Sequence, residues 1–361
     1  MKKTMRFFCL NLLLAICLSL VFSGCTTTGS AVASGGSGGS GVPAGAPNWV
    51  RDPYNKYDKQ TNFATVGSGK SRQEAEKNAL GKLVAIFGQS IQVDEKIANS
   101  YQEAVKSGAA ATWTENTSLD STITTSAGMD TLIGAETGEV WDDGKNNHYA
   151  VVVLNKTKAA QVYSGMIRSN QAMIENLIDI PASEKNTLEG FARYQFAATI
   201  ADINASYESV LAVIGMPSSI LGIQKGNDLR LEAANITKTI PVSVVVKNDR
   251  NNRVRDAFSK VLSDMGFQSG GTNSRYRVEA EVNISEAPSN TQNIFVRYEI
   301  NANFIDGNGN RILLPFNING REGHQSQANA ENRAFSAAER TIGTDFSEAL
   351  ESYFARLLPR R

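Results

Sequence analysis

The N-terminal segment constrains this chain more than any other part of its sequence. Three basic residues precede an uncharged and largely apolar stretch, 7–24, that ends at Cys25 in the letters VFSGC. A basic start followed by an apolar run too short for a good membrane-spanning helix predicts an export signal over residues 1–24. Cys25 would then be the only cysteine of the mature chain. We therefore expect a fold with neither an intramolecular disulfide nor a thiolate metal site.

The letters VFSGC resemble the lipobox of bacterial lipoproteins, in which small residues precede the cysteine. Ser23 and Gly24 are those small residues here, and Phe22 stands where leucine is commoner. The resemblance implies a diacylglyceryl group on the Cys25 thiol, cleavage before Cys25, and acylation of the new amino group with a fatty acid such as palmitate. Two or more acyl chains would hold the protein stably at a membrane. An ordinary signal peptide with an incidental cysteine is the alternative.

Composition divides the rest of the chain into four segments. Residues 25–46 carry the lipidated cysteine and an uncharged Gly/Ser-rich tether, which predicts a flexible linker. We expect an α+β domain over 47–156, a helical hairpin connector over 157–228, and a second α+β domain over 229–361. Each α+β domain exceeds 100 residues, so we expect each to bury its own core.

The charge balance argues against nucleic acid as a partner. Without the signal peptide, 33 basic residues remain against 36 acidic ones. Such a chain has no basic surplus to neutralise phosphates. A protein held outside the cytoplasmic membrane also meets neither the genome nor ATP in the ordinary course.

Residues 62–71, NFATVGSGKS, nevertheless look like a phosphate-binding loop with one letter wrong. The full pattern needs a glycine five residues before Gly69, where this chain has Ala64. A plainer interpretation explains every letter: a short strand, a turn at Gly67 to Gly69, and a helix. We therefore expect no nucleotide and no cofactor at this stretch.

The helix that follows has its own start signal. Ser71 with Glu74 forms a capping box, which satisfies free amides at a helix N-terminus. The pattern predicts a helix from 72 to about 106 with one apolar stripe, formed by Ala75, Ala79, Leu83 and Phe87.

The remainder of the first domain is predicted to form a strap and a hairpin. Trp49 and neighbouring tyrosines beside prolines predict an apolar strap over a domain edge, with a ligand-stacking platform as the alternative. Residues 131–156 predict a β-hairpin about the turn DGKNN. Asp142, Asp143 and His148 meet at this turn; we interpret them as a solvated turn, against a weak metal site.

Helical periodicity predicts the connector. One stripe, ending at Ile178, is broken by Pro181, and Ser183 is expected to cap the second helix. The two helices would form an αα-hairpin, a packed connector; a coiled-coil docking arm is the alternative.

The C-terminal domain is predicted as βαβββα. A strand near 240–249 precedes an amphipathic helix that ends near Gly266, and three strands and a final helical region follow. Gly343 is a possible break in that last region. Asp306 begins a Gly/Asn turn that resembles a calcium loop, but Arg311 stands where such a loop needs glycine, so we interpret it as a hairpin turn. The fold class is therefore α+β, with two modules, βαββ and βαβββα, joined by a helical hairpin.

Three stretches carry a resemblance to a known family: PNWV at 47, FATVGSGKSRQEAEKNALGKLVAIFGQSI at 63–91, and GAETGEVWDDGKNNHYAVVVLNK at 134–156. They resemble the Lpp-twenty family of bacterial outer-membrane lipoproteins over about residues 47–156. The resemblance implies an α+β module, an outer-membrane location, and roles around flagellar basal structures or envelope assembly, without established catalytic residues. The C-terminal part resembles, by topology alone, modules of envelope-assembly lipoproteins such as the curli-secretion type and the activators of peptidoglycan synthases.

These features together predict a non-enzymatic protein. The sequence contains no HExxH, no GxSxG and no nucleophilic cysteine in the mature chain, so we expect no catalytic residues, no cofactor and no metal. We expect a lipid-anchored envelope protein, at the periplasmic face or surface of the outer membrane, that acts as a scaffold or assembly factor by binding envelope proteins. A peptidoglycan or small-ligand binding module is the alternative, and an envelope hydrolase a remote third.

Overall fold

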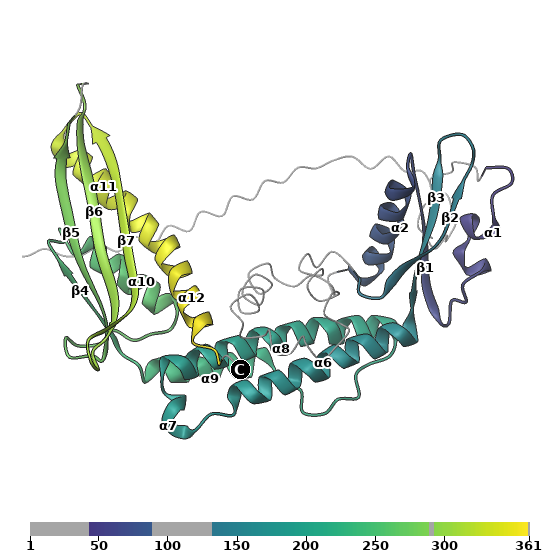
Figure 1. Ribbon diagram of the computed structural model, residues 1–361, viewed down its shortest axis with the longest axis horizontal. Coiled ribbons are helices and arrows are strands. Elements are labelled where there is room, and N and C mark those ends of the chain that lie inside the picture. The colour runs from purple at the N-terminus through teal and green to yellow at the C-terminus, as the bar shows by residue number, and fades with distance from the viewer. Residues whose placement is uncertain (1–42, 89–131, 289–291, 360–361) are drawn as a thin grey trace, which may run out of the picture. The chain divides into compact units, whose positions relative to one another are not determined.

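The computed structural model describes residues 43–88, 132–288 and 292–359 (Figure 1). Cys25, the tether and the Ser/Thr-rich stretch 112–126 lie outside the described residues. The described part contains an antiparallel sheet of three strands and a mixed sheet of four, together with the helices that cover them.

The first sheet has three antiparallel strands in the order β1-β3-β2. Their bounds are β1 (Asn62–Gly69), β2 (Ala135–Asp142) and β3 (His148–Asn155). Helix α2 (Arg72–Phe87) packs on one face with the expected stripe, since Ala75, Ala79, Leu83 and Phe87 are all at most 2% exposed. The predicted strand, capped helix and hairpin are confirmed.

Helix α2 is shorter than its sequence suggested. It ends at Phe87, where Gly88 takes a positive φ of 51°. Glycine adopts this conformation without steric cost, so it terminates helices readily. The predicted continuation to about residue 106 is therefore wrong at Gly88, and the positions beyond it lie outside the described residues.

The segment before β1 forms the expected strap. It consists of the short helix α1 (Asn48–Arg51) and a 3-10 turn at Pro53–Asn55. Trp49 is 4% exposed and packs with Val50, Ala64 and Val151 on the sheet face opposite α2. Trp49 is thus a packing residue, and the stacking-platform alternative does not hold for it.

The connector contains two long helices and one short helix. They are α6 (Lys156–Ile178), α7 (Ala182–Lys185) and α8 (Leu188–Ile214). The break at Pro181 is confirmed. The expected cap at Ser183 is wrong, because Thr187 caps α8 by accepting a hydrogen bond from the Gly190 amide at 3.1 Å.

A further helix, α9 (Gly226–Lys238), was not predicted from the sequence. It packs on α8 through Leu229, Ala233 and Ile236, which are at most 3% exposed. Its first residue touches α8: a β-carbon on Gly226 would lie 2.1 Å from an Asp202 carboxylate oxygen. The helix lacks a side-chain cap, the signal on which the prediction of helix starts relied.

The second sheet has the strand order β4-β5-β6-β7. Its strands are β4 (Val242–Lys247), β5 (Tyr276–Ala287), β6 (Ile294–Asp306) and β7 (Arg311–His324). The first pair is parallel and the others are antiparallel, so the chain crosses from β4 to β5 through helix α10 (Arg253–Asp264).

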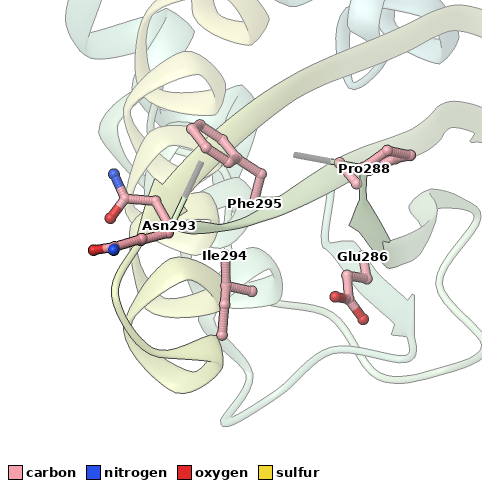
Figure 2. A pocket seen from close by; sticks show the side chains of 7 residues that line it. Glu286, Pro288, Asn293, Ile294 and Phe295 are labelled. Atoms are coloured by element: carbon pink, nitrogen blue, oxygen red, sulfur yellow. The ribbon is translucent and has the colours of Figure 1, made fainter. Parts of the chain in front are cut away.

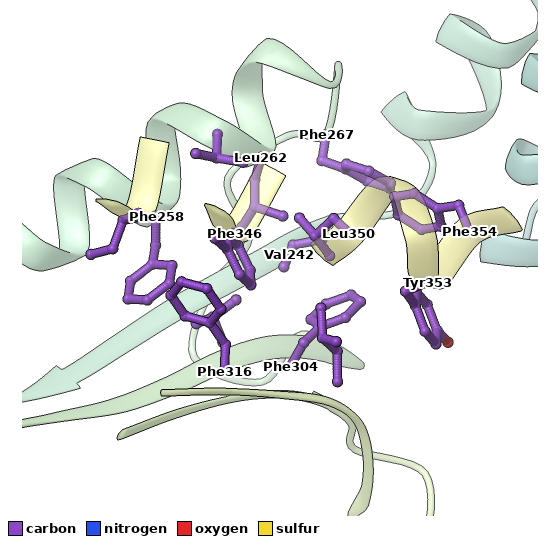
Figure 3. Packing of buried hydrophobic residues seen from close by; sticks show 14 of the residues in the cluster. Val242, Phe258, Leu262, Phe267, Phe304, Phe316, Phe346, Leu350, Tyr353 and Phe354 are labelled. Carbon is purple, nitrogen blue, oxygen red and sulfur yellow. The ribbon is translucent and has the colours of Figure 1, made fainter. Parts of the chain in front are cut away.

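Helices cover one face of this sheet (Figure 1), and the residues of its other face are mostly polar and exposed. The covering helices are α10, α11 (Gln327–Thr341) and α12 (Ser347–Arg356). The break suggested at Gly343 takes the form of a π-helical turn, Ile342–Phe346, which separates α11 from α12 and keeps both of its end residues buried. Aromatic rings fill the space beneath: Phe346 lies 4.8 Å from Phe258 and 5.2 Å from Phe316 between ring centroids (Figure 3).

The C-terminal core continues into the connector helices. The ring centroid of Phe191, in the first turn of α8, lies 5.1 Å from that of Phe267 and 5.1 Å from that of Phe354. The other ends of α6 and α8 belong to a separate cluster with α2 and β3, which includes Leu83, Leu154 and Ile214. Each end of the hairpin therefore contributes to a different core.

The α+β class and the predicted element orders, βαββ and βαβββα, are confirmed. Among the described helices, none combines the length and apolar character needed to cross a bilayer.

Candidate functional site

The glycines of the phosphate-loop-like stretch serve helix packing. Gly67 and Gly69 lie inside β1, and neither has a positive φ, so the predicted turn at these positions is wrong. A β-carbon on Gly67 would lie 2.2 Å from both the Ala75 carbonyl oxygen and the Ala79 amide nitrogen. Glycine at position 67 therefore lets α2 approach the strand closely.

The polar residues of the same stretch are engaged by the protein itself. The Glu74 amide donates to the Ser71 hydroxyl at 3.2 Å, as the capping box predicted. The Glu74 carboxylate in turn accepts from the Lys70 amide at 2.7 Å. The Lys70 ammonium donates to the Asn147 side chain at 2.9 Å, on the turn between β2 and β3. These contacts form a brace between α2 and the hairpin.

The acidic turn of the hairpin is held by its own hydrogen bonds. Asp143 accepts from the amides of Lys145 and Asn147 and from the Asn147 side chain, at 2.7 to 3.0 Å. The Asn147 side-chain hydrogen bond is the main cause of the lowered pKa of Asp143. Asp142 lies 3.3 Å from His148 Nδ1 and also accepts from the Gly144 amide. The described ranges contain no group of three metal-ligating side chains.

The turn that resembles a calcium loop is fixed by an arginine. Asp306 is 3% exposed and binds the Arg275 guanidinium through two hydrogen bonds of 2.9 and 2.8 Å. It also accepts from the Asn308 amide at 3.0 Å. The hydrogen bond from Arg275 is the main cause of the lowered pKa of Asp306. Both carboxylate oxygens are therefore used in joining the β6–β7 turn to the start of β5.

The strongest candidate for a binding surface lies on the strap face of the first sheet. The strap covers Ala64 and Val151, in the middle of this face. Nearer the hairpin turn, Trp141 of β2 and Tyr149 of β3 are direct cross-strand partners, with ring centroids 5.4 Å apart. Both stay partly exposed, as does Val66 beside them. We call Val66, Trp141 and Tyr149 the aromatic patch.

Polar groups surround the aromatic patch. Ser68 is the cross-strand partner of Tyr149 on the same face and is exposed. On the strap side, Lys56 forms an ion pair with Glu139. An apolar aromatic centre with a polar rim is the usual composition of a protein-binding surface, because Trp and Tyr bury large areas at low entropic cost.

The strap is itself fixed at the edge of this surface. Gly138, the bulge residue of β2, lies under the Tyr57 hydroxyl, where a β-carbon would be 2.3 Å from the oxygen. Burial, and secondarily the charge of Glu139, raise the pKa of Tyr57. The phenol therefore stays protonated at neutral pH and packs as an uncharged ring.

Sequence reasoning placed Trp141 and Tyr149 on a hairpin but did not bring them together. The signal that could have done so is the hairpin centre at Lys145, from which the two residues are equally distant in the chain. The predicted lipid attachment residue, Cys25, lies outside the described residues.

The pockets in the described part of the chain are weaker candidates for a binding site than the aromatic patch. One of about 490 Å³ lies at the end of the β5–β6 hairpin (Figure 2). Glu286 is the only charged residue of its lining, and the labelled side chains do not converge on a common point. Ligand pockets usually gather several polar groups toward one position.

Several solved structures resemble this chain, with low sequence identity and low TM-scores. A minor lipoprotein from Acinetobacter baumannii is 19% identical, with a TM-score of 0.24, 34% of this chain covered and 96% of that chain. A secreted protein from Helicobacter pylori is 11% identical, with a TM-score of 0.38, 78% of this chain covered and 97% of that chain. A protein from Caulobacter crescentus CB15 described as a lipoprotein is 12% identical, with a TM-score of 0.22, 32% of this chain covered and 87% of that chain. No curated protein matches the chain.

The family comparison concerns the first domain. The matched segment begins at the strap and ends with β3, so it contains the aromatic patch, α2 and the whole three-stranded sheet. It also coincides with the segment for which the resemblance was predicted. Residues 47–155 of this chain match the LPP20 lipoprotein family.

Proposed function

We propose that this chain is a lipid-anchored protein of the outer membrane, acylated at Cys25, that acts without catalysis as a scaffold or assembly factor. The LPP20 match supports an envelope lipoprotein. The lipobox-like sequence VFSGC and the uncharged Gly/Ser-rich composition of the segment after it support a lipid anchor at Cys25. The family resemblance favours flagellar or other outer-membrane structures as the place of action.

The aromatic patch is the observation that carries the proposed binding role. Trp141 and Tyr149 lie opposite each other on the β2–β3 hairpin, and both residues are partly exposed. A partner that covers the rings would bury the apolar area that they still expose, because Trp and Tyr bury 150–250 Å² each when fully packed. Their placement therefore favours a partner that covers them, with Trp141 as the central contact.

Site-specific crosslinking tests the proposal. A photo-reactive phenylalanine analogue would replace Trp141 in the full-length chain in living cells, with Lys77 on the exposed side of α2 as the control position. We expect a discrete protease-sensitive adduct from position 141 and none from position 77. Adducts that muramidase digests and protease does not would instead support peptidoglycan binding. Equal crosslinking from both positions would contradict the patch.

A further inference from the structure

Strand β5 has a sheet partner on only one side over its second half. Strand β4 pairs with it in parallel from Val242↔Tyr276 to Lys247↔Glu281, and then ends. Strand β6 continues on the other side as far as Ala287↔Phe295. Residues 282–287 therefore form a free sheet edge in line with β4, which we call the β5 edge.

The orientation of the open backbone groups follows from β4. The Val242 amide donates to the Gln268 carbonyl, and its carbonyl accepts from the Gly270 amide, both at 2.9 Å and on the side away from β5. Backbone groups alternate between the two sides of a strand. In β4 the backbone N–H and C=O groups of the odd-numbered residues therefore point toward β5. In β5 those of the even-numbered residues point toward β4.

Two residues of the β5 edge consequently present unpaired groups. Ile284 and Glu286 point their N–H and C=O toward the missing strand. Within 43–88, 132–288 and 292–359, neither residue has a hydrogen-bond partner on that side. The six-residue edge is about 20 Å long, which suits one ordinary strand.

The local fold keeps this edge open. Asn248, Asn251 and Asn252 all take positive φ near 58°, so the chain turns away directly after β4 and cannot extend along β5. A notch of about 430 Å³ remains, lined by Asn248, Arg250, Val282, Asn283, Ile284, Ser285 and Phe335. The notch lies where a continuing strand would run.

The opposite edge of the same sheet is protected against strand addition. Strand β7 carries Pro315, which has no N–H to donate, and its register with β6 shifts at Ile305. Both features discourage pairing with another strand. The β5 edge has neither feature, and its residues Val282 and Ile284 favour extended backbone.

Charge at the notch selects among extended segments. Lys247 directly precedes Asn248 of the notch lining and forms no ion pair with any side chain of the described ranges; its cross-strand neighbour Glu281 accepts from the Asn248 side chain at 3.5 Å. The Arg250 side chain is 58% exposed, although it pairs with Glu331. Lys247, a cation without an ion-pair partner in the described ranges, favours a carboxylate in the incoming strand.

We infer that the β5 edge binds an extended, acidic segment of a partner protein by strand addition. Backbone N–H and C=O groups at two-residue spacing are matched by another extended chain, so the occupant is a polypeptide. Ile284 and the adjacent Phe335 would contact an apolar side chain on the helix side of the sheet. This inference rests on the proposed partner-binding function and names the chemistry of the partner.

Fluorescence anisotropy with a defined probe tests the inference on the soluble mature chain. The probe is a labelled nine-residue peptide of alternating threonine and valine with one central glutamate. Two control peptides have N-methyl groups on one backbone edge, or lysine in place of glutamate. We expect the probe to bind and each control peptide to bind at least tenfold more weakly.

Two matched variants locate the binding. Glu286→Pro removes an N–H that faces the free side and leaves the ladder with β6 intact, whereas Glu286→Ala keeps that N–H. We expect at least a tenfold loss of affinity for the first and none for the second. A Lys247→Glu variant, which does not touch the backbone, is expected to weaken binding about tenfold, so a folding defect of the proline variant would not leave the question open.

Three results would overturn the inference. The N-methylated peptide could bind as tightly as the probe, or Glu286→Pro could bind the probe as tightly as the wild type. The third is no binding of the probe to the wild type at millimolar concentration. Crosslinking from position 141 separates this result from the proposed function. A protein adduct at position 141 together with a negative peptide result would reject the β5 edge alone.

Discussion

Gly67 of β1 and Ala79 of α2 approach so closely that a β-carbon on Gly67 would lie 2.2 Å from the Ala79 backbone nitrogen. The two atoms nearest to that carbon, the Ala75 carbonyl oxygen and the Ala79 amide nitrogen, both belong to the backbone of α2. Gly67→Ala must therefore move the helix. We expect a loss of about 3 kcal/mol in the free energy of unfolding, the upper part of the usual range for overpacking. Urea unfolding would measure it.

Gly81 is the matched control, since it lies on the exposed side of the same helix with open space around it. Gly81→Ala is expected to stabilise the protein by about 0.5–1 kcal/mol. If Gly67→Ala proved as harmless as Gly81→Ala, the close approach of strand and helix would be wrong.

The phosphate-loop-like letters give a second prediction. Ser71→Ala should cost about 1 kcal/mol, because the helix start loses its cap. Lys70→Ala should change stability by no more than about 0.5 kcal/mol, since an exposed contact to Asn147 contributes little. Calorimetry that detects ATP binding in the wild type and not in the Lys70 variant would contradict the capping interpretation.

These two cases show what the sequence could and could not reveal. The capping box and the apolar stripe are local patterns, so Ser71, Glu74 and Ala79 were placed correctly. The role of Gly67 depends on how closely α2 packs against β1, and the local sequence does not specify that distance. The turn expected at Gly67 was wrong for this reason.

The same limit applies to the connector and to the binding surface. Helix α9 was missed because its packing on α8, near Gly226 and Asp202, replaces the usual start signals. The pairing of Trp141 with Tyr149 depends on hairpin register, which the pattern constrained only loosely. The β5 edge depends on where β4 stops relative to its neighbour, a relation between segments about 35 residues apart.

The Arg275–Asp306 pair predicts a pH-dependent stability. The lowered pKa of Asp306 means that its carboxylate stabilises the folded state above the ordinary pKa of 3.8, and that this contribution is lost as the pH falls below it. Asp306→Asn should therefore cost about 1–2 kcal/mol at neutral pH, and the difference from wild type should shrink below about pH 4. Urea unfolding across this range would show it. A difference that stays constant with pH would show that the charge of Asp306 does not stabilise the turn.

The shared core at the end of the hairpin gives a prediction about fragments. The fragment 170–361 keeps Phe191 against Phe267 and Phe354, whereas 225–361 loses it. Removal of such a ring from a core costs about 3–5 kcal/mol. We expect both fragments to be soluble and the longer one to melt cooperatively at a clearly higher temperature. Equal melting temperatures would mean that the C-terminal sheet does not need the connector.

Lipidation at Cys25 is the central part of the proposed function, because it would place every proposed contact at the envelope. The direct measurement is metabolic labelling with an alkyne fatty acid in cells that express the full-length chain or its Cys25→Ala variant. We expect a labelled, processed wild type and an unlabelled variant that accumulates as precursor. Equal labelling of the two proteins, or an unlabelled wild type, would contradict lipidation at Cys25.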